Sequence, residues 1–288
     1  MRIGTVNGTK EILNKYNLYA LKQFGQNFIV DQNTLTAIIK NAGIDKNINV
    51  IEIGPGIGSL TEHLLENANK VLAYEIDKKL IPVLNDNFKE YDNFILKNED
   101  ILKADINKDV DKYFDDKEIY VVANLPYYIT TPIIMKFLEG NYPIHKYFYM
   151  VQKEVGERIC ANKGGKDYNN LTISINYKAD TEKVLDVSRN IFMPKPNVDS
   201  EVIMIKTPKE NPYLIENEDF FLKVVRASFV NRRKTLINNL NQAFNLNKTA
   251  LEELLNKLNI DINIRAEALD IKDFIELSKE LKKALGGA

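Results

Sequence analysis

The chain has 288 residues, of which 44% are hydrophobic, and its formal net charge is −1. No apolar run approaches the roughly 18 residues that a membrane span requires, and the amino-terminal segment lacks the apolar core of a signal peptide, so we expect a cytoplasmic protein without membrane contact. The single cysteine, Cys160, and the two histidines have no neighbours in sequence that would complete a metal site, so no metal is expected.

The first part of the chain alternates short apolar runs with longer amphipathic stretches. Residues 1–20 match no motif, and we interpret them as an additional helix or a mobile arm. The predicted strands are Asn49–Gly54, Lys70–Asp77, Phe94–Asp100, Ile119–Leu125, Tyr147–Gln152, Val184–Arg189 and Val202–Thr207. Helical stretches such as Leu60–Asn67 and Pro132–Glu139 lie between them. Continuously apolar strands alternating with helices predict a doubly wound α/β sheet.

The pattern changes after residue 207. The polar, proline-bearing segment PKENPYLIENED indicates a linker. No strand pattern follows it, and helical periodicity dominates over Phe220–Phe244, Thr249–Leu258 and Lys272–Leu285. We therefore predict two domains, an α/β domain over residues 1–207 and a small all-helical domain over residues 208–288.

The segment IEIGPGIGSL, residues 51–60, is an apolar strand that enters a glycine-rich turn and then a helix. Glycines let the backbone turn tightly and approach a ligand closely. Dinucleotide enzymes place a third glycine where this chain has Ser59, whereas glycines at 54, 56 and 58 after Glu52 are typical of class I methyltransferases. The loop favours a methyltransferase over a dinucleotide enzyme, and a turn without a ligand is the remaining alternative.

Acidic residues follow the next two strands. Glu75 ends the second strand about 20 residues after the loop, a position from which carboxylates accept hydrogen bonds from a ribose diol. Asp100, at the end of the third strand, is placed to accept a hydrogen bond from a cofactor's adenine amine. Its neighbour Glu99 is equally suited, and the sequence leaves this choice open.

The fourth strand ends in Asn124-Leu125-Pro126-Tyr127. Asparagine and proline are also ordinary turn residues, but this order suits a specific reaction. The exocyclic amine of adenine is a poor nucleophile because its lone pair is delocalised into the ring. The Asn124 side-chain oxygen and the carbonyl of Leu125 or Pro126 would accept its two hydrogens and localise that lone pair, while Tyr127 would stack on the base.

Several motifs in this order resemble the ribosomal RNA small-subunit adenine dimethyltransferase family. The matching segments are LKQFGQNFIVDQ (21–32), IEIGPGIGSLTEHLL (51–65), NEDIL (98–102), VVANLPYYITTPIIMKFL (121–138), VQKEVGERI (151–159), FMPKPNVDSEV (192–202) and FVNRRKTLINNL (229–240). The resemblance implies a Rossmann-like class I methyltransferase sheet with a small all-helical carboxy-terminal domain. It also implies S-adenosyl-L-methionine as the cofactor. The implied substrate is a pair of adjacent adenosines in a hairpin loop near the 3′ end of 16S rRNA, within the small ribosomal subunit.

The resemblance also carries residue roles over to this chain. It assigns cofactor binding to Asn27, Ile29, Gly54, Gly56, Glu75, Asp100 and Asn124. It assigns the reaction to Asn124, Leu125, Pro126, Tyr127 and Phe192, with Tyr127 and Phe192 stacking on opposite faces of the target adenine. Ile29 stands where leucine is more common in the family, which should not matter if its backbone makes the contact. We expect the protein to act as a monomer.

A stretch without acidic residues runs from residue 220 to residue 251. Four of its basic residues are the predicted RNA-binding set, Arg226, Arg232, Arg233 and Lys234. Arg226 and Arg233 are seven apart, so one continuous helix would place them near one face. An ordinary solvated face is the alternative, and the absence of acids favours a surface that binds rRNA phosphates.

Three other functions share parts of this pattern. A large-subunit rRNA methyltransferase that confers macrolide resistance has the same glycine loop and asparagine–proline motif, but Leu125 and the segment RRKTLINNL favour the small-subunit enzyme. A non-catalytic ribosome-assembly or transcription factor with this fold would not need the residues for methyl transfer, and here they are all present. A dinucleotide oxidoreductase is disfavoured by Ser59 and by the absence of a proton donor near the loop.

Overall fold

The computed structural model describes residues 2–18 and 26–286. The chain divides into two compact units, Met1–Gly156 with Thr181–Thr207 and Glu157–Asp180 with Pro208–Ala288. A boundary falls between residues 207 and 208, where the sequence indicated a linker, but residues 157–180 belong to the second unit. The buried ring of Tyr177 lies 5.3 Å from that of Phe221. This contact joins positions too distant in sequence for local patterning to relate them.

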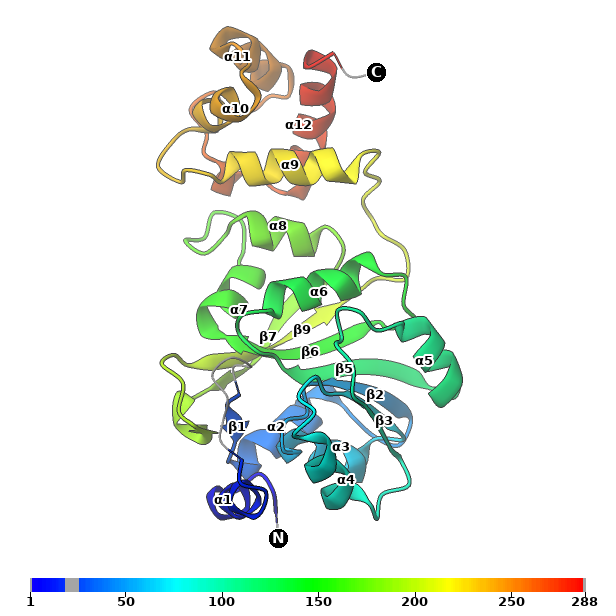
Figure 1. The fold of residues 1–288 in the computed structure, drawn as a ribbon. Coiled ribbons are helices and arrows are strands. Elements are labelled where there is room, and N and C mark those ends of the chain that lie inside the picture. Colours follow the sequence, from blue (N-terminus) through cyan, green and yellow to red (C-terminus); the bar gives the residue numbers. More distant parts are fainter. Residues whose placement is uncertain (1, 19–25, 287–288) are drawn as a thin grey trace. The chain divides into compact units, whose positions relative to one another are not determined.

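A seven-stranded sheet forms the centre of the first unit (Figure 1), in the order β4-β3-β2-β5-β6-β9-β7. Strands β4 to β6 pair in parallel, and β9 pairs antiparallel with β6. The bounds are β2 Ile48–Ile53, β3 Val71–Tyr74, β4 Phe94–Lys97, β5 Glu118–Asn124, β6 Lys146–Gln152, β7 Asp180–Val187 and β9 Ser200–Lys206. The predicted doubly wound α/β sheet is confirmed.

Helices cover both faces of this sheet. Alternate side chains of β6 show the two faces, because Phe148 lies in one core with Leu64 of α3, whereas the ring of Tyr147 lies 5.8 Å from that of Phe137 in α6. The helices are α2 Gln32–Ala42, α3 Ser59–Asn67, α4 Ile81–Phe88, α5 Ile106–Tyr113 and α6 Thr130–Glu139. Helix α7, Lys153–Ile159, contains the division between the two units. This two-sided burial explains why the central strands are apolar without alternation.

A second, two-stranded ladder was not predicted. Strand β1 (Phe28–Ile29) pairs antiparallel with β8 (Phe192–Met193), which follows the short 3-10 helix η2 (Arg189–Ile191). Two residues are too few to show the period of two by which strands are recognised in a sequence. The ladder places Ile29 opposite Phe192, so two segments far apart in the chain meet there.

The amino-terminal segment contains helix α1 (Val6–Lys15), which is the helical one of the two interpretations of residues 1–20. Thr5 caps the helix by accepting a hydrogen bond from the backbone of Gly8 at 3.1 Å. Arg2 forms ion pairs with Glu62 and Glu66 of α3. Lys15 pairs with Asp86 of α4 at 2.6 Å, so both ends of α1 are attached to helices of the first unit.

The second unit contains the helices α8 Asn170–Asn176, α9 Glu218–Ser228, α10 Leu236–Phe244, α11 Lys248–Lys257 and α12 Ile271–Ala284, and the 3-10 helix η3 Ala266–Ala268. The prediction of one helix over 220–244 is wrong, since residues 229–235 separate α9 from α10. The amide nitrogen of buried Asn239 donates to the carbonyl oxygens of Ser228 at 2.8 Å and Asn231 at 3.1 Å. These bonds satisfy backbone acceptors where α9 ends and thereby stabilise the break.

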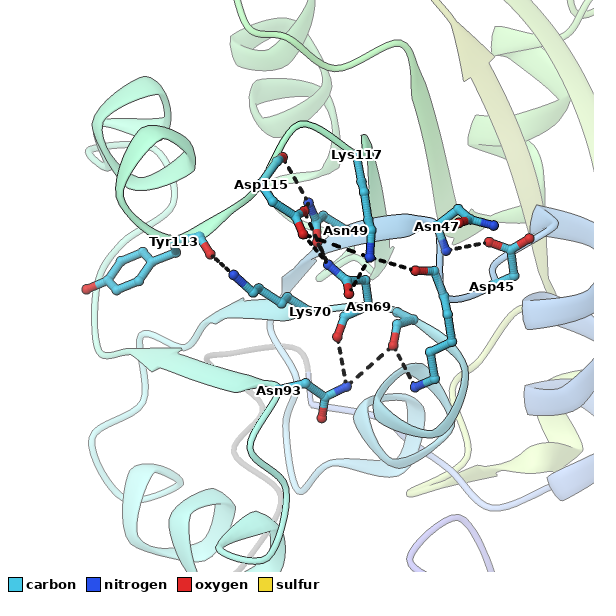
Figure 2. A network of polar contacts seen from close by, with 11 residues as sticks. Asp45, Asn47, Asn49, Asn69, Lys70, Asn93, Tyr113, Asp115 and Lys117 are labelled. Carbon is cyan, nitrogen blue, oxygen red and sulfur yellow. Dashed lines mark hydrogen bonds and ion pairs between the residues drawn. The ribbon is translucent and has the colours of Figure 1, made fainter.

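A polar network closes the edge of the sheet where the parallel strands begin (Figure 2). Asn49, fully buried at the start of β2, donates to Asp115 Oδ1 at 2.7 Å and accepts from Asn69 Nδ2 at 2.8 Å. Lys117 Nζ donates to Asn69 Oδ1 at 2.7 Å, and Asn93 Nδ2 donates to the carbonyl oxygen of Asn69 at 3.2 Å. The loops preceding β3, β4 and β5 are therefore fastened to one another and to β2.

Among the residues described, no helix has both the length and the apolar character needed to cross a membrane.

Replacing Asn49 by alanine is expected to lower the free energy of unfolding by about 1–3 kcal/mol, because Asn69 and Asp115 lose a buried partner. Urea denaturation measures this change. Asn107→Ala is the matched control, since Asn107 is an exposed asparagine whose side chain makes one bond, to the carbonyl of Asn141 at 3.2 Å. A shift of less than about 0.5 kcal/mol is expected for the control, and an equally small shift for Asn49→Ala would contradict the prediction.

Candidate active site

Residues at the carboxyl ends of the parallel strands line one open pocket in the first unit, with about 1030 Å³ of space when the open solvent at its mouth is included. The turns after β2, β3, β4 and β5 contribute its walls, together with Gln26–Ile29. Four carboxylates are among its lining residues, Glu52, Glu75, Glu99 and Asp100. No lysine, arginine or histidine is among the described residues that line it. This charge favours a cationic ligand and disfavours a pyrophosphate.

The glycine loop needs its glycines for backbone geometry. Gly54, Gly56 and Gly58 have φ angles of 66°, 61° and 99°, in the region that side chains with a Cβ avoid. A Cβ on Gly58 would also lie 2.5 Å from the ring of Phe88 in α4. At Gly54 a Cβ would meet no atom within 4 Å, so the backbone there faces open space. The loop thus turns tightly and leaves room for a ligand.

Two carboxylates are buried in the pocket wall. Burial raises the pKa of Glu52 to about 8, although Thr61 opposes this shift and the nearby Glu75 adds to it. Oε2 of Glu52 is buried and has no hydrogen-bond partner in the part of the chain described. Burial also raises the pKa of Glu75 to about 7, against the opposing hydrogen bonds that it accepts from the backbone of Asp77 at 2.8 Å and of Gly56 at 3.2 Å. A ligand with positive charge or hydrogen-bond donors would satisfy both groups.

Glu99 and Asp100 both line the pocket, as the sequence allowed, but their surroundings differ. The Glu99 carboxylate pairs with Lys97 at 2.7 Å, and Lys97 also pairs with the buried Asp109. Asp100 uses Oδ1 to accept from the backbone of Leu102 at 2.9 Å. Lys97 thus holds Glu99 through its charge, whereas Asp100 is bound through a single oxygen.

Asn124, the last residue of β5, is fixed by a hydrogen bond to Asn27. Its Nδ2 donates to the carbonyl oxygen of Asn27 at 3.1 Å. A carbonyl oxygen only accepts hydrogen bonds, so this contact determines which end of the Asn124 amide faces Asn27. The Asn124 side-chain oxygen then remains as the acceptor for a ligand in the pocket.

The two backbone carbonyls next to Asn124 differ in what they already bind. The Pro126 oxygen accepts from the backbone of Ile129 at 3.1 Å and from the hydroxyl of Thr130 at 3.2 Å, where α6 begins. Residue Leu125 is buried, and its N–H donates to the carbonyl of Met150 in β6 at 3.1 Å. The Pro126 carbonyl is therefore committed to starting α6, which favours the Leu125 carbonyl as the second acceptor.

Tyr127 is half-buried in the pocket wall, and its hydroxyl lies 2.8 Å from Oγ of Ser200, a buried residue at the start of β9. Burial raises the pKa of Tyr127, and the Ser200 bond opposes the shift. The hydroxyl is therefore neutral at physiological pH, and it holds the ring against the sheet. Sequence reasoning did not identify Ser200, because only the fold brings β9 to this loop.

The structure places the remaining predicted residues unequally. Asn27 and Ile29 line the pocket, and so do Gly54 and Gly56. Phe192 is buried in the core beside Ile29 and does not line the pocket. Gln26 also lines the pocket and was not identified from the sequence, although it directly precedes Asn27 in the same motif.

The predicted basic residues lie in the second unit. Arg226 is in α9, and Arg232, Arg233 and Lys234 are in the break before α10, so the expectation of one shared helix face is wrong. All four are exposed, and none of the three arginines forms an ion pair with a described residue. The basic groups therefore remain available to an acidic partner.

In the described part of the chain, no group of three or more histidine, cysteine or acidic side chains is placed to hold a metal.

Comparisons with known proteins agree over nearly the whole chain. The family model described as ribosomal RNA adenine dimethylase matches residues 18–283. A Bacillus pumilus protein named ribosomal RNA small subunit methyltransferase A is 47% identical, with 98% of each chain covered. A Clostridioides difficile protein of the same name is also 47% identical, with 96% of each chain covered.

Solved structures give the same picture of the fold. A dimethyladenosine transferase from Plasmodium falciparum superposes with a TM-score of 0.73 at 28% identity, covering 90% of this chain and 98% of the other. The 23S rRNA methyltransferase ErmE superposes with a TM-score of 0.67 at 23% identity, covering 89% of this chain and all of that one. At that identity the second likeness concerns the fold alone.

Proposed function

The chain belongs to the ribosomal RNA adenine dimethylase family, and from this premise we propose that it transfers methyl groups from S-adenosyl-L-methionine to N6 of adenine in small-subunit rRNA. The proposed substrate is the pair of adjacent adenosines in a hairpin loop near the 3′ end of 16S rRNA. One observation carries the proposal: an acidic pocket, with no basic residue among the described residues that line it, ends at Asn124 and Leu125, two acceptors suited to an amine.

The described residues of the pocket fit this cofactor. When bound, S-adenosyl-L-methionine supplies a methyl group activated by a positively charged sulfonium. The unpartnered Oε2 of Glu52 and the carboxylate-rich lining suit a ligand with positive charge. Glu75 would accept hydrogen bonds from the ribose hydroxyls and Asp100 one from the adenine amine, with Gly54 and Gly56 giving the backbone access. A dinucleotide would bring two phosphates to a pocket whose described lining offers no cationic side chain.

Asn124 and Leu125 would bind the target amine and prepare it for reaction. Two acceptors facing the two N–H groups would draw the nitrogen towards a tetrahedral geometry, in which its lone pair is localised. The contact with Asn27 fixes the Asn124 oxygen before the substrate arrives, so little reorganisation is needed in the transition state. After the transfer the amine carries an extra proton of low pKa, which water removes.

Tyr127 would hold the adenine by stacking, with its hydroxyl anchored on Ser200. Phe192 would contribute indirectly, because in this structure it supports Ile29 from the core instead of lining the pocket. The second unit would supply affinity for rRNA through Arg226, Arg232 and Arg233, because exposed cations that meet phosphates release counterions.

A methyl-transfer assay on unmethylated small subunits, with large subunits as the parallel substrate, tests the proposal. We expect dimethyladenosine at two neighbouring positions of small-subunit rRNA and none in the large subunit. Incorporation into large-subunit rRNA would instead support the macrolide-resistance type of enzyme. Particle binding without any methyl transfer would support the non-catalytic assembly factor.

The affinity for S-adenosyl-L-methionine is expected to rise about tenfold between pH 6 and pH 8 as Glu75 ionises. Burial raises the pKa of Glu75 to about 7, and ribose hydroxyls bind the ionised carboxylate, so protonation below that pKa competes with binding. Calorimetry across this range measures the effect. Glu75→Gln should flatten the profile and weaken binding by about 1–3 kcal/mol at pH 8. A full pH dependence in Glu75→Gln would assign the titration to another carboxyl, with Glu52 the first choice.

Asn124→Ala is expected to remove most methyl transfer while rRNA binding stays nearly intact, because its oxygen binds the amine most strongly as charge develops. Tyr127→Ala should in addition loosen the hold on the adenine by roughly 1–3 kcal/mol of stacking. Tyr127→Phe keeps the ring and should retain much of the activity. Single-turnover methylation with parallel binding measures all three, and near-normal rates for Asn124→Ala would rule out the amine-binding role.

Replacing Arg226, Arg232 and Arg233 together by alanine should weaken rRNA binding and flatten its salt dependence, since each lost phosphate contact removes counterion release. Cofactor affinity should not change, because the pocket lies in the first unit. The matched control replaces Lys257, Lys272 and Lys283, which removes the same charge from the same unit. Lys257 and Lys283 already pair with Glu280, so the control should keep the full salt slope. Equal losses of rRNA affinity and salt dependence in the two variants would show that the arginines form only an ordinary solvated face.

A further inference from the structure

Asp77 is a buried carboxylate beside the pocket that the proposed reaction does not use. It follows β3 and is only 6% exposed. Its Oδ1 accepts from the backbone of Lys79 at 3.0 Å, which is an ordinary turn contact. Its Oδ2 accepts from the side-chain amide of Gln26 at 3.1 Å, across 51 residues of sequence. The second bond joins the turn after β3 to residues 26–29, which line the pocket.

Asp77 is also bonded to the proposed ribose acceptor. Its backbone N–H donates to Oε1 of Glu75 at 2.8 Å, and the backbone of Gly56 in the glycine loop donates to Oε2 at 3.2 Å. One residue therefore contacts Glu75 through its backbone and Gln26 through its side chain. The position of the Glu75 carboxylate and the position of Gln26 both depend on Asp77.

The segment held by Gln26 leads to the reacting end of the pocket. The next residue, Asn27, accepts the hydrogen bond that orients Asn124, and Ile29 lies in a ladder of only two residues. So short a ladder fixes the segment weakly by itself. A bond at Gln26 adds a fixed point directly before Asn27. A continuous series of contacts thus runs from the glycine loop through Glu75, Asp77 and residues 26–27 to Asn124.

We propose that Gln26 and Asp77 are positioning residues. They set residues 26–29 against the cofactor pocket, so that the ribose acceptor Glu75 and the amine acceptor Asn124 are aligned together. The inference rests on the proposed function, since it assigns the pocket to S-adenosyl-L-methionine. Neither residue touches the reacting atoms. Their effect passes through Glu75 on one side and through the Asn27 carbonyl on the other.

The polarity of the pair gives a test by exchange. Gln26→Glu places a second carboxylate against buried Asp77, and like charges at hydrogen-bond distance repel. Asp77→Asn removes the charge but keeps an oxygen for the Lys79 backbone. The double variant Gln26→Glu/Asp77→Asn restores one donor facing one carboxylate, with the roles reversed. Recovery in the double variant therefore reports the contact itself and not the general tolerance of either position.

The experiment measures S-adenosyl-L-methionine affinity by calorimetry, and single-turnover methylation, for the wild type, both single variants and the double variant. We expect Gln26→Glu to bind the cofactor about tenfold more weakly and to methylate more slowly at saturating cofactor, because the Asn124 contact is disturbed as well. The double variant should recover to within about threefold of the wild type. Urea denaturation verifies that each variant is folded, and Asp77→Asn alone serves as a second route if Gln26→Glu unfolds.

Three results would overturn the inference. Wild-type affinity in Gln26→Glu would show that the contact positions nothing. A double variant as weak as Gln26→Glu would show that the two positions act separately. A wild-type protein that does not bind S-adenosyl-L-methionine at all would overturn the proposed function together with this inference. Normal cofactor binding in every variant would overturn this inference alone.

Discussion

The site depends on one constraint of parallel sheets, which is that strands running in the same direction end at the same edge. β2, β3, β4 and β5 are neighbours and parallel, so the four turns that follow them meet without any long insertion. The opposite edge shows the converse, because the loops that precede these strands meet in the network around Asn49 and Asn69. One edge is fastened by polar side chains and the other remains open for a ligand.

Electrostatics determines which ligands that open edge favours. Burying Glu52 and Glu75 near each other disfavours their charged forms, which raises their pKa values to about 8 and about 7. A neutral or anionic ligand would leave the cost in place. A cation, or a ligand rich in hydrogen-bond donors, offsets it. Under the proposed function, the same carboxylates favour a sulfonium nucleoside over a dinucleotide.

Features determined by local chemistry were predictable from the sequence, and features determined by tertiary contacts were not. The apolar strands and the turn residues Gly54, Glu75 and Asn124 follow from patterns within a few residues of each. The proposal of Leu125 over Pro126 as acceptor required the bonds that start α6, and the break between α9 and α10 required Asn239. The contact between Gln26 and Asp77 joins residues 51 apart, which no periodicity in a single sequence reveals.

Two successive transfers to one nitrogen constrain the proposed amine site further. An unmodified amine has two hydrogens and can bond to Asn124 and Leu125 at once, but a monomethylated amine has only one. The second transfer must therefore proceed with one acceptor unbonded and with a methyl group in the space of the lost hydrogen. The Asn124 amide is held through its Nδ2, which donates to the Asn27 carbonyl, whereas the Leu125 carbonyl belongs to the backbone that continues from β5. Neither acceptor can swing away, so the substrate itself must rotate or shift between the two transfers. A base held by stacking on Tyr127, and not by a further hydrogen bond to its ring, retains that freedom.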